Sequence, residues 1–377
     1  MSDHDALLAA VIAAPDDDLP RLVFADYLDE AGDPARAEFI RVQIDLARRP
    51  VGDPARPGMT AREQSLLAEY GREWRIPGLR ATVQRFRRGF VELVEIPAHV
   101  LIQAADRVFT ANPVRHLRVA TADEYTEPLA RVAGLARVET LDLSGNTLAA
   151  RGRLERFLTD APLMALTRLI VRNNRLWPEN VAQIARSPVA PRLRALDLSG
   201  NPLADAGAEA LAAGPTLAGL AELTLLNQHQ PFDESVHAAG AAALARSGTL
   251  THLRTLALGG HYVGDAGLID LASTQNARRL THLDLSQNDL GAIGPVGYEE
   301  LVRSPHLNRL RWVNLSGARN RVDRLAAQAL AGWPRLADGV RVDLRGCELD
   351  AAGRAVLMAS SHAGQLLLDP PDAEGSL

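Results

Sequence analysis

Lysine is missing from this chain of 377 residues, so all 41 basic side chains are arginine. A chain without lysine has no Walker A phosphate loop, no kinase strand lysine and no Schiff base. The single cysteine, Cys347, excludes an internal disulfide, a four-cysteine zinc site and an iron–sulfur cluster. A glycine-flanked serine elbow, a paired histidine motif and a Gly-x-Gly-x-x-Gly loop are also missing. These absences predict a protein that is not an enzyme and that holds no cofactor and no metal.

Strong charge and long apolar runs are missing too. The net charge of -5 is mild, so neither nucleic acid nor an anionic membrane is expected as a partner. The first residues, Met1 to Asp5, are acidic where a signal peptide needs positive charge. The apolar run that follows, Ala6 to Ala14, is too short to span a bilayer. These features predict a cytoplasmic protein.

One phrase recurs between Val138 and Leu349: leucines at the first, fourth and sixth positions, then an asparagine at the ninth. The clearest copies are LRALDLSGN from Leu193, LTHLDLSQN from Leu280 and VETLDLSGN from Val138. A repeat of about 28 residues predicts one strand and one helix in each unit. The second leucine of each copy falls, at intervals of 27 to 33 residues, at Leu141, Leu169, Leu196, Leu223, Leu256, Leu283, Val313 and Val342.

The spacing within the phrase has a mechanical interpretation. Leucines two apart, such as Leu196 and Leu198, point to the same side of a strand, so Asp197 between them points to solvent. The asparagine can bond backbone groups of adjacent coils, because its amide both donates and accepts. The occupants of this asparagine position along the repeats are Asn146, Asn174, Asn201, Gln228, His261, Asn288, Ala318 and Cys347. Because Cys347 falls at this position, the pattern predicts a structural role for its side chain rather than a reactive thiol.

The helical halves of the repeats are visible in Ala204–Ala213, Gly264–Ser273 and Ala351–Ala359. Each has a glycine followed four residues later by a leucine on the same helical face. We expect the small glycine positions to let each helix approach its strand closely.

Alternating strand and helix at this period resembles the ribonuclease-inhibitor-like class of leucine-rich repeats, over roughly residues 110–370. The resemblance implies an α/β fold: a horseshoe with a parallel β-sheet on the concave face and helices on the convex face. Clear repeats are expected over about 135–350, with weaker capping repeats at each end. No unit can bury its leucines alone, so the stack folds as a quasi-one-dimensional array.

Residues 1–80 do not share the period and predict a small all-α domain ahead of the repeats at 81–377. Pro20 suits the first turn of one helix, and Asp33 with Pro34 suits the start of the next. Thr60 and Glu63 have capping-box spacing and predict a helix to about Trp74. The string DDDLPRLVFADYLDEAGDPARAEFIRVQ, residues 16–43, resembles the repeat-companion domain of certain bacterial proteins. The passage RRGFVELVEIP, residues 87–97, resembles the join into their repeats.

The concave face is the first candidate binding surface, because it carries a mixed stripe of outward side chains. Trp312 beside Arg311 or Arg341 would anchor a partner, since aromatic and arginine side chains dominate interface energies. The aspartates have a second interpretation, in which they only solvate the sheet or bond to neighbours. The predicted partner-binding residues are Arg118, Asp142, Arg168, Arg172, Asp197, His282, Asp284, Trp312, Asn314, Arg341, Asp343 and Arg345.

Two further segments are weaker candidates. An insertion at 227–237 (NQHQPFDESVH) could contact a partner, but it lacks the histidine spacing of a helical zinc site. A cluster of arginines near the join could receive phosphate or an acidic partner, or could be a solvated face that pairs with nearby acids. The cluster comprises Arg72, Arg75, Arg80, Arg85, Arg87 and Arg88.

The sequence therefore predicts a non-catalytic protein–protein interaction scaffold that binds through the concave face. The alternative is a regulatory, GTPase-activating type of protein, which rests on fold analogy alone. A ubiquitin-ligase-like effector would need a catalytic cysteine in a separate domain, and Cys347 sits in a predicted turn. The identity of the protein partner and the oligomeric state do not follow from these patterns.

Overall fold

The computed structural model describes residues 2–79, 82–227, 231–292 and 294–369. The chain divides into two compact units: unit 1 is Met1–Asn146 with Asp160–Leu166, and unit 2 is Thr147–Thr159 with Thr167–Leu377. The predicted α/β class, with parallel strands and N-terminal helices, is confirmed. The predicted domain boundary at residues 80 and 81 lies outside the described residues.

Unit 1 begins with helices α1 (Asp3–Ala13), α2 (Leu19–Glu30), α3 (Pro34–Arg48) and α4 (Arg56–Tyr70). Proline lies in the first turn of α2 and of α3, as predicted. The carboxylate of Asp33 caps α3 by accepting from the Arg36 N–H at 3.1 Å.

The predicted capping box at Thr60 is wrong. Helix α4 already begins at Arg56, where a proline in the first turn presets the helical backbone angle. The Asp53 carboxylate accepts from the Ala55 N–H at 2.8 Å and fixes the turn ahead of it. Glu63 instead accepts from Nε2 of Gln43 at 2.6 Å, which holds α4 against α3.

The second part of unit 1 starts with an antiparallel hairpin of β1 (Val83–Arg87) and β2 (Phe90–Pro97). Gly89 in the turn has φ of 88°, and a Cβ there would lie 2.5 Å from Cγ1 of Ile40. Helix α3 therefore packs directly onto the hairpin backbone. Helices α5 (Ala98–Thr110) and α6 (Thr126–Ala130) and parallel strands β3 (His116–Ala120) and β4 (Thr140–Asp142) follow.

A group of buried charges joins the helices of unit 1 to its strands. Glu92 on β2 is 1% exposed, and its Oε1 lies 2.7 Å from Nη2 of Arg21 on α2, whose side chain is fully buried. Arg88 and Arg115 each lie 3.5 Å from the same carboxylate. Burial lowers the pKa of Arg21, and the charge of Glu92 opposes that shift. Arg21 also donates to the Arg88 and Pro15 carbonyls, which satisfies much of its guanidinium.

Unit 2 is a stack of strand–helix repeats. Its strands run parallel in chain order, and the predicted leucines pair rung on rung. The ladder runs Leu169, Leu196, Leu223, Leu256, Leu283, Val313, Val342 and Leu366. The strands are β5 (Arg168–Ile170), β6 (Ala195–Asp197), β7 (Glu222–Thr224), β8 (Thr255–Ala257), β9 (His282–Asp284), β10 (Trp312–Asn314), β12 (Arg341–Asp343) and β14 (Leu366–Leu367). A separate pair, β11 (Arg321–Val322) and β13 (Glu348–Leu349), lies between the later repeats.

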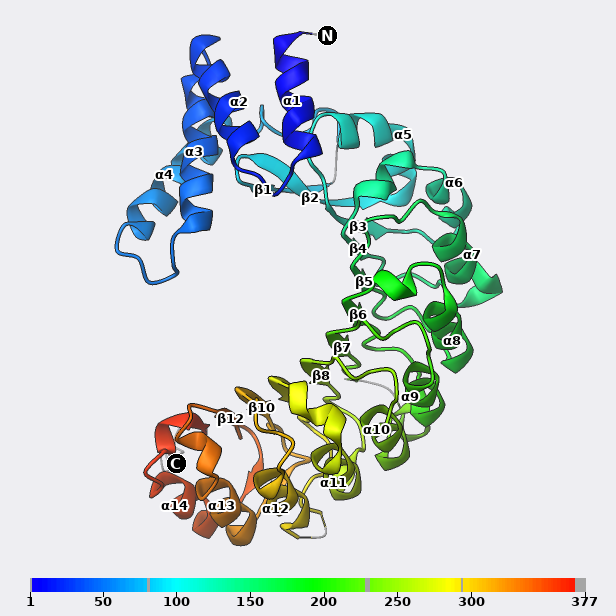
Figure 1. The fold of residues 1–377 in the computed structure, drawn as a ribbon, viewed down its shortest axis with the longest axis vertical. Helices are drawn as coiled ribbons and strands as arrows, with labels where there is room; N and C mark the ends of the chain where they lie inside the picture. The colour runs from blue at the N-terminus through cyan, green and yellow to red at the C-terminus, as the bar shows by residue number, and fades with distance from the viewer. Residues whose placement is uncertain (1, 80–81, 228–230, 293, 370–377) are drawn as a thin grey trace, which may run out of the picture. The chain divides into compact units, whose positions relative to one another are not determined.

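The helices of unit 2 lie on the outer side of its arc, with the strands along the inner side (Figure 1). The predicted helices at 204–213, 264–273 and 351–359 are confirmed to within one residue. They are α7 (Arg153–Asp160), α8 (Pro178–Arg186), α9 (Ala204–Ala212), α10 (Ala238–Ala245), α11 (Gly264–Ser273), α12 (Val296–Arg303), α13 (Arg324–Ala331) and α14 (Ala351–Met358).

The expected strand partner of the helical glycines is wrong for Gly267, whereas a Cβ on Gly353 would lie 3.1 Å from the Val322 carbonyl of strand β11, in agreement with the expectation. A Cβ on Gly267 would lie 2.5 Å from Cγ1 of Val263 and 3.1 Å from Cβ of Ala241 on the neighbouring helix α10. A Cβ on Gly240 would likewise meet Ala208 of α9 at 3.1 Å. Gly240 and Gly267 therefore bring successive helices together, rather than a helix and its strand.

The asparagine position bonds adjacent coils, as predicted. Oδ1 of Asn201 accepts from the N–H groups of Asn174 and Leu176, and its Nδ2 donates to the Val171 and Leu198 carbonyls. Its side chain therefore satisfies four backbone groups that would otherwise be buried without partners.

Two of the described repeats fill this position with another residue type, His261 and Cys347. His261 accepts the Val236 N–H at Nδ1 and bonds the Leu225 carbonyl through Nε2. Burial lowers the pKa of His261 to about 4, so its ring is neutral. The Cys347 thiol donates to the Leu315 carbonyl at 3.0 Å, and burial raises its pKa to about 12.

The prediction that Ala318 occupies the asparagine position is wrong, because Asn320 makes these backbone bonds instead. The loop after β10 places Asn320 where the Ala318 side chain was expected. The other expected occupant, Gln228, lies outside the described residues.

Candidate functional site

The aspartates at the ends of the repeat strands hold the turns that follow them. In each case the carboxylate accepts from the N–H group two residues later, at distances of 2.8 to 3.1 Å. Short side-chain-to-backbone bonds of this kind fix a local turn. The four carboxylates are those of Asp142, Asp197, Asp284 and Asp343.

Arginines neutralise much of the sheet face. In unit 1, Arg118 lies 3.4 Å from Glu95 and 3.8 Å from Asp142. In unit 2, Arg168 pairs with Glu222, and Arg172 with Asp197, both at 2.6 Å. These cations already have partners, so a ligand gains little from them.

The same holds at the C-terminal strands of unit 2. Arg345 pairs with Asp343 at 2.5 Å, and its hydrogen bonds to that carboxylate lower the pKa of Asp343 against the opposing effect of burial. Nδ2 of Asn314 donates to Asp284 at 2.9 Å. These residues, which were predicted to bind a partner through the concave face, therefore bond to one another.

His282, Trp312 and Arg341 form a row on adjacent strands, because Trp312 is in register with His282 on one side and with Arg341 on the other. We call these three residues the strand row. Trp312 is half-buried, whereas His282 and Arg341 are exposed. No hydrogen bond or ion pair of the Arg341 side chain exists within the described residues. The strand row therefore combines an aromatic surface with an available guanidinium.

A polar pocket of about 550 Å³ lies at the start of the strands that carry the strand row. Arg254, Thr281 and Arg311 line it from the positions directly before β8, β9 and β10. Its remaining lining residues are Arg279, Asn308, Arg309, Leu310, Arg335 and Asp338. We call this the arginine pocket. The sequence analysis missed it, apart from Arg311, although the repeat spacing places Arg254, Thr281 and Arg311 at equivalent positions.

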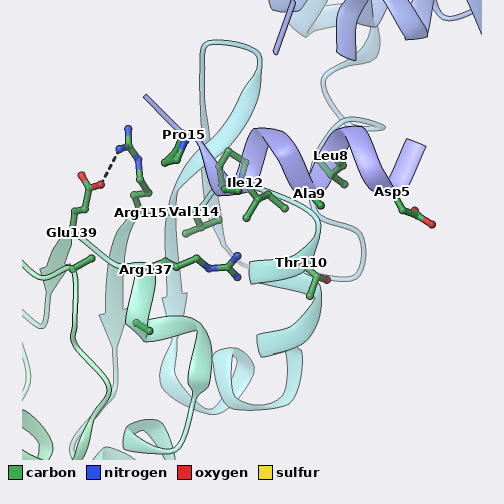
Figure 2. Close-up of a pocket in the computed structure, with 14 residues that line it drawn as sticks. Asp5, Leu8, Ala9, Ile12, Pro15, Thr110, Val114, Arg115, Arg137 and Glu139 are labelled. Carbon is green, nitrogen blue, oxygen red and sulfur yellow. Dashed lines mark hydrogen bonds and ion pairs between the residues drawn. The ribbon is translucent and has the colours of Figure 1, made fainter. Parts of the chain in front are cut away.

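Unit 1 contains a larger and more apolar groove of about 750 Å³ (Figure 2). Leu8, Ala9 and Ile12 of α1 form one wall, and Val114 contributes to the opposite side. At one end Arg115 pairs with Glu139 at 2.8 Å. The groove has no convergent set of polar groups that would define a chemistry.

Two of the arginines predicted near the join, Arg85 and Arg88, are engaged within unit 1, whereas Arg72, Arg75 and Arg87 are exposed. Arg88 is mostly buried and donates to the Pro15 and Asp16 carbonyls. Arg85 lies 3.7 Å from Glu95. Arg80 lies outside the described residues. The interpretation that such arginines pair with nearby groups holds for Arg85 and Arg88.

The described part of the insertion includes a short 3-10 turn, Phe232–Glu234. His237 forms an isolated bridge with Tyr262, and its Nδ1 lies 3.7 Å from Asp205. Within the described ranges, no group of three or more histidine, cysteine, aspartate or glutamate residues could hold a metal ion. Among the helices in the described ranges, none has the length and the apolar character needed to cross a bilayer.

The comparisons with known proteins agree with this architecture. A family model described as leucine rich repeat matches residues 191–212, 249–272 and 277–294, all of them in unit 2. These matches agree with the strand–helix period and the leucine ladder of unit 2, and they identify leucine-rich repeats in that part of the chain.

Individual relatives are more distant. The chain is 28% identical over 255 residues to the Tonsoku-like protein of Mus musculus. This match covers 64% of the present chain and 18% of the mouse protein. The chain thus spans less than a fifth of the length of the curated relatives it matches. Among solved structures, the yeast Rad7 and Elc1 complex is similar at 14% identity and a TM-score of 0.43, over 91% of this chain and 94% of that one. An internalin from Listeria monocytogenes has 21% identity and a TM-score of 0.34, over 54% and 48%.

Proposed function

We propose that the protein is a non-catalytic interaction scaffold, and that it binds a protein partner through the sheet face of unit 2 at β9, β10 and β12. A stack of repeats presents a preformed surface, so binding costs little conformational entropy. Protein recognition is what leucine-rich repeats generally provide, and the matched repeats lie in this unit.

The strand row is the observation that carries this proposal. Arg168 on β5 and Arg172 just after it are paired with carboxylates, whereas Arg341 has no side-chain partner within the described residues. Binding hot spots are enriched in tryptophan and arginine, and a partner would bury both groups together at Trp312 and Arg341. The remaining predicted residues of the face act mainly on one another.

The test compares two double variants of the whole chain in affinity capture from the native host, followed by mass spectrometry. Trp312→Ala with Arg341→Glu removes the strand row. Met358→Ala with Arg324→Glu truncates another large apolar side chain and reverses the same charge, at exposed positions on helices α14 and α13. We expect the wild type and the helix variant to retain the same partners, and the strand-row variant to lose them.

A hot-spot loss of about 2 kcal/mol weakens binding roughly 30-fold, which is enough to remove a partner from the capture. Thermal unfolding of both variants checks that the fold is intact. Capture of the same partners at the same yield by both variants would contradict the proposal. The GTPase-activating alternative and the cytoplasmic location stay expectations from the sequence, since no structural observation favours the former.

A further inference from the structure

The arginine pocket collects positive charge that the protein itself does not neutralise. Among its lining residues, Asp338 supplies one carboxylate, and Arg335 already binds it at 2.7 Å. The other four guanidinium groups are exposed and have no side-chain hydrogen bond or ion pair within the described part of the chain. They belong to Arg254, Arg279, Arg309 and Arg311.

The repeat architecture builds this concentration of charge. The Arg311 N–H donates to the Thr281 carbonyl at 2.9 Å, and the Thr281 N–H donates to the Arg254 carbonyl at 2.8 Å. These bonds place three neighbouring coils side by side at the edge of the sheet. Arg279 and Arg309 arise from the segments that enter β9 and β10, two residues before Thr281 and Arg311. On β9 and β10 the residues directly after Thr281 and Arg311 are His282 and Trp312, two members of the strand row.

Like charges held together repel, so the arrangement is unfavourable unless an anion shares the site. Elsewhere on unit 2 the chain supplies that anion itself, as Glu222 does for Arg168 and Asp197 does for Arg172. Arginine is suited to carboxylates because its planar fork can donate two parallel hydrogen bonds. Several such forks around one pocket match a group of neighbouring carboxylates better than a single one.

We propose that the arginine pocket binds an acidic segment of a protein partner, with two or more neighbouring aspartate or glutamate side chains. This inference rests on the proposed function and adds the chemistry of the partner. The acidic segment enters the pocket, and the residues beside it lie against the strand row.

A protein segment fits the surroundings better than a nucleic acid. Nucleic-acid binding relies on an extended track of cations that follows the phosphate backbone. Here the four neighbouring arginines line one pocket rather than an extended track, the sheet face beside it carries Asp284 and Asp343, and the chain as a whole has a net charge of -5.

The test measures fluorescence anisotropy of labelled probes with the full chain. The probes are a ten-residue peptide of alternating aspartate and glycine, the same peptide with asparagine, and a short single-stranded DNA of equal charge. Arg254→Gln with Arg309→Gln changes the pocket. Arg186→Gln with Arg324→Gln removes the same charge from exposed, unpaired arginines on α8 and α13.

We expect the acidic peptide to bind, the asparagine peptide not to bind, and the pocket variant to weaken binding at least ten-fold. The variant with Arg186→Gln and Arg324→Gln should weaken peptide binding less than two-fold. Equal losses in both variants, no binding of the acidic peptide, or tighter pocket-dependent binding of the DNA would overturn the inference.

A third variant separates this inference from the proposed function. Trp312→Ala leaves all pocket arginines in place, so it should leave the affinity for the acidic peptide largely unchanged. Peptide binding that depends on Arg254 and Arg309, together with partner capture that ignores the strand row, would keep the pocket and reject the proposed face. Partner capture that depends on the strand row, without binding of the acidic peptide, would keep the proposed face and reject the pocket.

Discussion

Arginine occupies opposite environments in the two units. In unit 1, Arg21 is fully buried, lies 2.7 Å from the Glu92 carboxylate and donates to two backbone carbonyls. In unit 2, Arg254 and Arg309 lie exposed in one pocket with no carboxylate partner in the described chain. A chain without lysine uses one cation for both purposes. The supply of carboxylates, rather than the type of residue, separates an arginine that holds the fold from one that is available to a ligand.

The buried polar groups of the two units differ in the same way. Unit 1 buries full charges, at Arg21 and Glu92. Unit 2 also buries carboxylates, at Asp197, Asp265 and Asp343, but at its repeat turns it relies on uncharged groups that bond to backbone, such as Asn201, His261 and the half-buried Cys347. Buried charge is costly once its partner is removed, whereas buried neutral groups become costly when they are made to ionise. Each unit therefore has its own weak point.

Removal of the Glu92 charge is expected to have the largest effect. Glu92→Gln leaves Arg21 buried without its counter-ion and beside Arg88 and Arg115. Loss of one partner of a buried pair costs about 3–5 kcal/mol of unfolding free energy. Urea unfolding followed by circular dichroism measures this loss.

The matched control is Glu222→Gln, whose carboxylate pairs with the half-exposed Arg168 in unit 2. An exposed pair is worth less than about 1 kcal/mol. Equal losses in the two variants would show that burial does not distinguish the units as argued above.

Acidification tests the neutral interior of unit 2. The pKa of His261 is about 4 in the folded protein, below its ordinary value of 6.5. The unfolded chain therefore takes up a proton as the pH falls below about 6.5, while the folded chain does not until about 4. The stability that neutral His261 contributes is fully present above pH 6.5 and is lost as the pH falls to about 4, by roughly 3 kcal/mol in total.

The variant His261→Asn keeps a donor and an acceptor at this position but does not titrate. Between about pH 7.5 and pH 4.5, the wild type should lose roughly 2–3 kcal/mol more stability than this variant. Thermal or urea unfolding at both pH values gives the difference. Identical losses in the two proteins would mean that His261 is not the group that senses the pH.

The smallest effect on stability is expected in the arginine pocket. Arg254→Gln with Arg309→Gln breaks no bond within the described chain and relieves repulsion between like charges. The unfolding free energy should stay within about 0.5 kcal/mol of the wild type, or rise slightly. A loss above about 1 kcal/mol, measured by urea unfolding, would mean that these arginines serve the fold after all.

The repeat architecture could be predicted because the leucine spacing fixes which side chains point inward. Leu196 and Leu283 occupy equivalent rungs, and helix α11 has the predicted ends, since both follow from one repeated pattern. The start of α4 could not be predicted from the capping-box spacing, because Glu63 is bonded to Gln43 on another helix. The shift from Ala318 to Asn320 depends on the length of a single loop.

The candidate site was only partly predictable for a related reason. The register that aligns His282, Trp312 and Arg341 follows from the repeat period. The sequence pattern does not show that Asp197 and Asp343 would be occupied by neighbouring arginines, because those pairs depend on side-chain reach. The arginine pocket collects residues from several entering segments, and only a comparison of the position before each strand would have indicated it.

The close contact of the glycine-bearing helices sets how far the sheet face of unit 2 opens. Neighbouring strands are separated by about 4.8 Å, whereas packed helices need about 8–10 Å between their axes. This mismatch bends the stack toward its strands. Gly240 and Gly267 let neighbouring helices approach more closely than larger side chains would, which limits the bend per repeat. A larger side chain at either position would bend the stack further toward its strands and leave less room there for the flank of a folded domain.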